Sequence, residues 1–156
     1  MTLTILSLED EAEVRDALER DLEGFWDRIR LETAEDVDDA WAALEAVIAD
    51  GDELALVLSD HRLPGQSGVD FLVDLVADTR FPGVRTVLVT GQADQDDTIR
   101  AVNQAKLDHY IAKPWAKEDL IAVVRDQLTE YVLDAGIDPL PYLPVLDGVR
   151  VMESLR

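Results

Sequence analysis

Side chains that could carry out chemistry stand directly after four short apolar runs of the chain. They are three carboxylates, or four if Glu11 is counted, with one hydroxyl and one ammonium, namely Glu9, Asp10, Asp60, Thr90 and Lys113. Clustered carboxylates resist ionisation unless a cation lies among them, and open oxygen ligands suit Mg²⁺, which commonly shares its shell with a phosphate. An ammonium and a hydroxyl can bind phosphoryl oxygens, and an Asp beside the metal can be the nucleophile. This pattern predicts Mg²⁺-dependent phosphoryl transfer that gives an aspartyl phosphate.

Five runs, mostly of Val, Ile and Leu, are too short for helices and predict strands. They cover residues 3–8, 29–31, 54–58, 86–89 and 110–112. Apolar strands that alternate with amphipathic helices indicate a parallel sheet covered on both faces. We therefore predict a doubly wound α/β domain of five βα units. In such a sheet ligands bind outside the carboxyl ends of the strands, which is where the polar side chains above converge.

Segments with a helical spacing of apolar residues lie between and after these strands. The stripes cover residues 14–22, 37–48, 69–76 and 120–132, and a weaker one covers residues 99–102. Thr33, with Asp36 three residues later, resembles a capping box for the second helix. Ser67 or Gly68 is expected to begin the third helix.

Composition narrows the class of protein. The 156 residues include 34 Asp and Glu against 14 Lys and Arg, a formal net charge of −20. Such a balance argues against nucleic-acid binding, which needs clustered cations, and against anionic membranes. Cysteine is absent, which excludes disulfides and zinc-thiolate sites. The apolar runs are too short to span a bilayer and the N-terminus lacks a signal-peptide pattern, so a cytoplasmic location is predicted.

The regular pattern stops near Asp134. Three of the six prolines lie within residues 139–144, so the last segment begins as an extended or turning one. About 20 residues are too few for a second domain. A docking tail, a dimerisation arm and the start of a linker all fit this segment.

Four motifs follow one another at the ends of the predicted strands. They are ILSLEDE, LSDHRLPGQSG, VLVTG and YIAKPW. Together they resemble the receiver domain of two-component response regulators, of the CheY-like superfamily, and the resemblance covers about residues 3–134. It implies a five-stranded, flavodoxin-like (βα)5 fold. We predict a receiver domain over residues 1–134 and a C-terminal extension or linker over residues 135–156.

The resemblance also implies which residues form the phosphorylation site. Asp60 matches the phosphoacceptor, which is also a metal ligand. Glu9 and Asp10 match the acidic pair, of which Asp10 is the direct Mg²⁺ ligand. The main-chain carbonyl of Arg62 matches the third protein ligand.

Further matches concern the response to phosphorylation. Thr90 matches the hydroxyl residue that follows the phosphoryl group, and Lys113 matches the lysine of the family's KP motif. Tyr110 matches the aromatic switch residue. The resemblance implies a cis bond between Lys113 and Pro114, and only bonds before proline adopt cis at low cost.

The sequence departs from the usual motifs at three positions. Glu9 replaces the commoner Asp and is expected to reach the metal through water. Gly91 replaces a usual Ala, which leaves the phosphoryl site at least as open. Arg62 adds a long cation two residues after the acceptor, and we expect it to alter hydrolysis of the acyl phosphate.

The expected function is that of a regulator that is phosphorylated by a histidine kinase or phosphotransfer protein, turns over no metabolite and switches conformation. A homodimer through the fourth helix, fifth strand and fifth helix, or through the tail, is a further possibility. The alternative is an adaptor or dimerisation module that works without phosphorylation. A haloacid-dehalogenase-like hydrolase would need a DxD pair after the first strand, which LEDEAE does not supply there.

Other residues carry weaker signals. The TG, AVN and KPW sequences resemble a receiver subgroup often joined to enzymatic output modules. His61 and His109 have no partner histidine at ligand spacing, so exposed or capping roles are expected. Trp115 follows the KP turn and could flank a partner surface.

Overall fold

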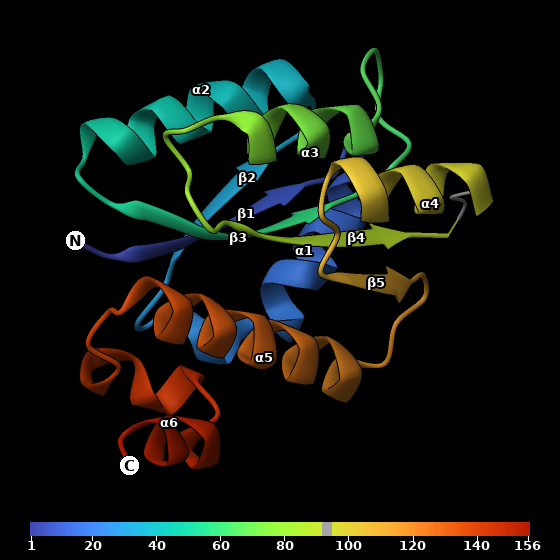
Figure 1. Ribbon diagram of the computed structural model, residues 1–156. Coiled ribbons are helices and arrows are strands. Elements are labelled where there is room, and N and C mark those ends of the chain that lie inside the picture. Colours follow the sequence, from blue (N-terminus) through green and yellow to red (C-terminus); the bar gives the residue numbers. More distant parts are fainter. Residues whose placement is uncertain (92–94) are drawn as a thin grey trace.

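The computed structural model describes residues 1–91 and 95–156 and contains one parallel sheet of five strands (Figure 1). The strand order is β2-β1-β3-β4-β5, so the chain winds outward in both directions from β1 and β3. The strands are β1 (Leu3–Leu8), β2 (Arg30–Ala34), β3 (Glu53–Ser59), β4 (Arg85–Thr90) and β5 (His109–Ala112). The predicted doubly wound α/β fold is confirmed.

Helices cover both faces of the sheet (Figure 1). One face carries α2 (Val37–Ala49), α3 (Gly68–Ala77) and α4 (Gln95–Gln104), and the other carries α1 (Ala12–Asp21) and α5 (Lys117–Ala135). A 3₁₀ turn, η1 (Glu23–Phe25), follows α1. Across residues 1–91 and 95–156, no helix combines the length and apolar character needed to cross a membrane.

Alternation of side chains along β1 explains why apolar residues stand at both odd and even positions of this strand. Leu3 and Ile5 belong to the core on the α1 and α5 side, whereas Leu6 and Leu8 belong to the core on the α2 and α3 side. Successive side chains of a strand point to opposite faces of the sheet. A central strand covered on both faces therefore needs apolar residues at both parities.

Two local expectations were wrong. The second strand runs over Arg30–Ala34, so Thr33 belongs to the strand, and the N-cap of α2 is Asp36, whose side chain accepts a hydrogen bond from the Asp39 N–H. In the fourth helix the expected apolar stripe is exposed, with Ile99 at 49% and Val102 at 53%. Ser67 caps α3, and it is one of the two residues, Ser67 and Gly68, that were expected to begin this helix.

The segment after α5 folds back onto the body of the protein. It forms η2 (Leu140–Val145) and α6 (Gly148–Ser154), and Val145, Leu146 and Val151 are buried in the core beside α5. Asp147 caps α6 through its side chain, and its own N–H donates to Thr129 Oγ1 on α5 at 2.9 Å. The division of the chain at residue 134 stays a prediction.

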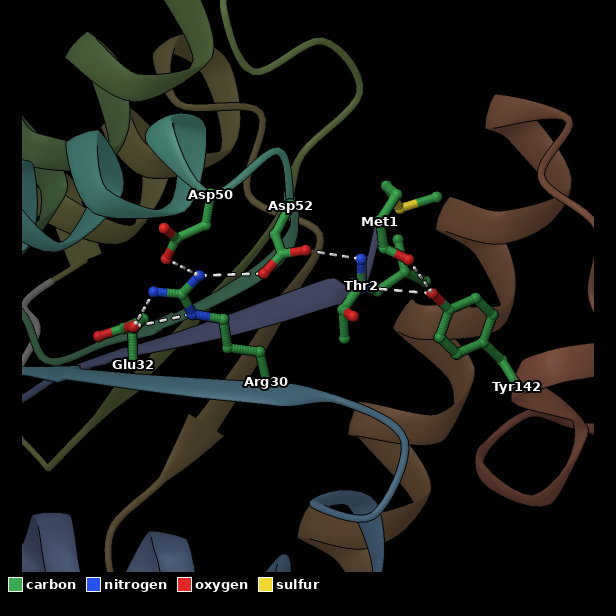
Figure 2. A network of polar contacts seen from close by, with 8 residues as sticks. Met1, Thr2, Arg30, Glu32, Asp50, Asp52 and Tyr142 are labelled. Carbon is green, nitrogen blue, oxygen red and sulfur yellow. Dashed lines mark hydrogen bonds and ion pairs between the residues drawn. The ribbon is translucent and has the colours of Figure 1, made fainter.

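Polar contacts tie the start of the sheet to this last segment (Figure 2). The Tyr142 hydroxyl accepts the Leu3 N–H at 3.3 Å and donates to the Met1 carbonyl at 3.4 Å. The Thr2 N–H donates to Asp52 at 2.8 Å, and Asp52 also bonds Arg30 at 3.0 Å. These contacts join the amino ends of β1, β2 and β3 to a residue far along the chain.

Gly68, the first residue of α3, lies against the backbone of Asp60, just after the end of β3. A Cβ at this position would be 1.7 Å from the Asp60 carbonyl oxygen, a distance no real side chain adopts. The Gly68 N–H donates to the His61 carbonyl at 2.8 Å. Glycine is therefore required here because two backbone segments approach closely.

We predict that Gly68→Ala lowers the free energy of unfolding by about 2 kcal/mol, because the added methyl group forces α3 away from the end of β3. Gly148→Ala is the matched control, since no atom lies within 4 Å of its added Cβ. Urea unfolding of both variants measures the difference. Equal stability of Gly68→Ala and the wild type would contradict this account.

Candidate functional site

The candidate site lies at the carboxyl ends of β1, β3, β4 and β5, the edge that the sequence pattern indicates (Figure 1). Glu9 and Asp60 follow β1 and β3 directly. Their backbones continue the sheet contacts beyond the strands, because the Glu9 N–H donates to Ala34 and the Asp60 N–H to Leu8. The two carboxylates are thus carried by rigid neighbouring strands.

Lys113 joins the two carboxylates. Its Nζ lies 2.7 Å from Glu9 Oε1 and 3.0 Å from Asp60 Oδ2. The Lys113–Pro114 bond is cis, as the resemblance implied, and the Lys113 N–H donates to the Thr90 carbonyl. The Glu9 side chain is 2% exposed and that of Asp60 is 7% exposed, so both charges are largely removed from water.

The acidic residues can hold a divalent cation. One carboxylate oxygen from each of Glu9, Asp10 and Asp60 lies within 4.8 Å of the others. Asp10 is exposed, whereas the other two are buried. Glu9 Oε2 is buried and finds no hydrogen-bond partner in the part of the chain that the structure describes. Oxygen ligands that are partly buried and partly open fit Mg²⁺, which keeps several waters.

Burial and neighbours push the pKa values of the two buried carboxyls apart. Burial raises the pKa of Glu9 to about 7, and the nearby Asp60 adds to this, while the hydrogen bond from Lys113 opposes it. Burial would also raise the pKa of Asp60, but hydrogen bonds with Glu9, Thr90 and Lys113 together hold it below its usual range. The same contacts raise the pKa of Lys113 against the effect of burial. Asp60 is therefore ionised at neutral pH.

The remaining predicted residues lie on β4, on β5 and in the loop after β3. Thr90 is the last residue of β4 and is 1% exposed. The Tyr110 hydroxyl donates to the Thr90 carbonyl at 3.1 Å, which links β5 to β4. The Arg62 N–H donates to Asp60 Oδ1 at 3.4 Å, which places the Arg62 backbone beside the Asp60 carboxylate. The fold thus brings together the side chains that the sequence predicts to act together.

One residue at the site was placed wrongly from sequence. The His61 side chain is only 11% exposed, and its Nε2 lies 3.0 Å from Asp97 Oδ2 at the start of α4. No spacing rule links residues this far apart, so only the packing of α4 beside the loop after β3 reveals the pair. Trp115 also has an internal partner, since its Nε1 donates to Asp21 on α1 at 2.9 Å.

A doubly wound sheet of order β2-β1-β3-β4-β5, with an acidic pocket and a lysine at its carboxyl edge, defines a class of signalling domain. Residues 5–125 match the family described as the response regulator receiver domain. The chain belongs to this family.

Relatives and solved structures agree with this assignment. The chain is 34% identical to the hydrogenase transcriptional regulatory protein HoxA of Cupriavidus necator, over 78% of this chain and 23% of HoxA. It is 32% identical to the phosphate regulon transcriptional regulatory protein PhoB of Escherichia coli, over 80% of this chain and 51% of PhoB. The chain thus spans about half or less of these relatives. A CheY-like receiver domain from Methanospirillum hungatei superposes with a TM-score of 0.73 at 25% identity, over 86% of this chain and 99% of that one.

The raised pKa of Glu9 predicts a pH-dependent stability in chelating buffer. Its carboxyl has a pKa of about 7 in the folded protein against 4.5 ordinarily, so between these values the folded state binds more protons than the unfolded state. The stabilising contribution of protonated Glu9 is therefore present at low pH and is lost as pH rises through about 7.

Glu9→Gln removes this titration. We expect a stability near that of the wild type at pH 5 and about 2 kcal/mol above it at pH 8. Glu13→Gln, at an exposed position of α1, controls for the loss of one charge. Urea unfolding at both pH values measures the difference, and a Glu9→Gln effect that does not grow with pH would overturn the assignment.

Proposed function

We propose that this receiver domain accepts a phosphoryl group on Asp60, with Mg²⁺, from a histidine kinase or phosphotransfer protein, and signals through a change of conformation. The observation that carries the proposal is the contact of one ammonium, Lys113, with both Glu9 and Asp60. Family membership supports it, because receiver domains are parts of regulators rather than metabolic enzymes.

The residues support a direct transfer. Asp60 attacks the phosphorus of phosphohistidine in line, an O–P bond forms, and the N–P bond breaks as the imidazole leaves with its electron pair. Lys113 neutralises charge on the phosphoryl oxygens, and the Thr90 hydroxyl donates to one of them. Hydrolysis of the product by water returns Asp60 to its carboxylate.

Mg²⁺, where bound, would neutralise charge on the phosphoryl oxygens. Asp10, Asp60 and the main-chain carbonyl of Arg62 would hold it directly, and Glu9 would do so through water. The buried Glu9 oxygen without a partner among the described residues supports this arrangement.

The response begins where the phosphoryl group meets β4 and β5. Movement of Thr90 toward the group would change the carbonyl that Tyr110 bonds, and so the surface of α4, β5 and α5. This is a shift between two existing conformations. That surface, or the segment after α5, is where a second copy would bind.

The setting of this function is inferred from charge and from relatives. A cytoplasmic location fits a domain that receives phosphate from a kinase. A net charge of −20 supports the inference that these 156 residues bind no nucleic acid themselves. Transcriptional regulation belongs to HoxA and PhoB by their names, and this chain corresponds to only part of each.

Asp60→Ala is expected to abolish phosphorylation by acetyl phosphate in the presence of Mg²⁺, because it removes the nucleophile. Asp38→Ala, which removes an exposed carboxylate of α2, serves as the control and is expected to be phosphorylated like the wild type. Incorporation of labelled phosphate is the measurement. The proposed function fails if Asp60→Ala is still labelled.

Arg62→Ala is expected to shorten the half-life of the phosphorylated protein about threefold, because a long exposed side chain beside the acceptor hinders the approach of water. Arg62→Lys keeps length and charge and is expected to lie closer to the wild type. Loss of label after removal of the phosphate donor gives the rates. An unchanged half-life in Arg62→Ala would show that this side chain plays no part in hydrolysis.

A further inference from the structure

His61 connects the phosphoacceptor loop to the start of α4. Its backbone carbonyl accepts the Gly68 N–H at 2.8 Å, which fixes it to the first turn of α3. Its ring Nε2 lies 3.0 Å from Asp97 Oδ2. Its Nδ1 is buried with no hydrogen-bond partner among residues 1–91 and 95–156. Within that part of the chain, Asp97 is therefore the partner that orients the ring.

A second ion pair holds the same helix one turn later. Arg100 Nη2 of α4 lies 2.5 Å from Asp70 Oδ1 of α3. Asp70 is itself fixed, because its N–H donates to Ser67 Oγ in the cap of α3. The two pairs anchor the first two turns of α4 to α3 and to the loop before α3. The helices α3 and α4 lie side by side in Figure 1.

Apolar packing contributes little to holding α4. Among the described side chains of the helix and of the residue after it, the fully buried ones are Ala101 and Ala105. Ile99 and Val102 point outward and are about half exposed. An alanine methyl buries little surface, so polar contacts account for a large share of what fixes the position of α4.

We propose that His61 is a positioning residue that tethers the start of α4 through Asp97 and thereby favours the conformation without a phosphoryl group. The inference rests on the proposed function, since it assumes that the phosphoryl group forms on the adjacent Asp60. The tether needs only an N–H on Nε2 that points at the carboxylate, and not a particular charge on the ring.

Phosphorylation would weaken this tether through charge. A phosphoryl group on Asp60 adds negative charge beside His61, which repels the Asp97 carboxylate and competes for the N–H of the ring. The helix is then released from the loop. By linkage, removing the tether in advance favours the conformation that binds a phosphoryl analogue.

Asp97→Ala and Asp96→Ala separate this contact from the general effect of charge, because alanine leaves no side-chain acceptor for the His61 N–H. Both remove one carboxylate from the first turn of α4, but Asp96 is exposed and Asp97 is the residue that meets His61. We expect Asp97→Ala to bind beryllofluoride with Mg²⁺ about fivefold more tightly than Asp96→Ala, and its α4 amides to exchange hydrogen about fivefold faster in chelating buffer. Asp97→Glu, which keeps the carboxylate, is expected to lie nearer to the wild type.

The affinities and the exchange rates each test whether His61 and Asp97 tether α4. Equal affinities and equal exchange rates in the two Ala variants overturn it, as does weaker binding by Asp97→Ala. If the wild type binds no beryllofluoride in the presence of Mg²⁺, the proposed function fails. The exchange rates of α4 in chelating buffer still decide whether His61 and Asp97 hold the helix.

Discussion

The contact of the Lys113 ammonium with Glu9 and Asp60 is the interaction on which the site depends. One positive charge faces two buried carboxylates, with a third on the exposed Asp10 beside them. Because Glu9 is buried and the negative charges outnumber the positive one, protonation of Glu9 is favoured, and its pKa rises to about 7. The pKa of Asp60 is lowered, so Asp60 stays ionised. Two carboxyls with separated pKa values are typical of sites in which each has its own role. In the function that we propose, Asp60 would be the nucleophile, and Glu9 would release its proton when a cation binds.

The cluster of charges at the opposite end of the sheet shows that the effect of carboxylates around one cation depends on how deeply they are buried, and not only on their number. There Arg30 meets three carboxylates, from Glu32, Asp50 and Asp52 (Figure 2). The Asp50 side chain is 59% exposed, so water screens the excess negative charge, and the cluster serves to join strands. At the carboxyl end, where Glu9 and Asp60 are almost completely buried, water cannot do so. An excess of carboxylates thus joins strands at the amino end, whereas at the carboxyl end it leaves two buried carboxyls whose pKa values differ.

The sequence predicted which side chains gather at this edge, because parallel topology alone brings the ends of β1, β3, β4 and β5 together. Glu9, Asp60 and Lys113 needed no knowledge of side-chain packing to be grouped. The contact of His61 with Asp97 could not be predicted without that knowledge. It depends on how α4 lies across the sheet, and the spacing of hydrophobic residues does not specify this position. The contacts of Tyr142 with the first strand were also beyond sequence pattern, since no periodicity relates the ends of the chain.

The helices are attached to the sheet with very different strengths, and this difference bears on where the domain can move. Buried side chains line the length of α5, which is also packed by the segment after it, including Val145 and Val151. By contrast, α4 contributes mainly small methyl groups to the core, a burial of about 1 kcal/mol for each methyl. A change of charge at the carboxyl edge of the sheet alters interaction energies by an amount similar to this burial energy. Under the function that we propose, such a change would displace α4 while the strands and α5 stay in place, so that the helix that responds is separate from the strands that carry the phosphorylation site.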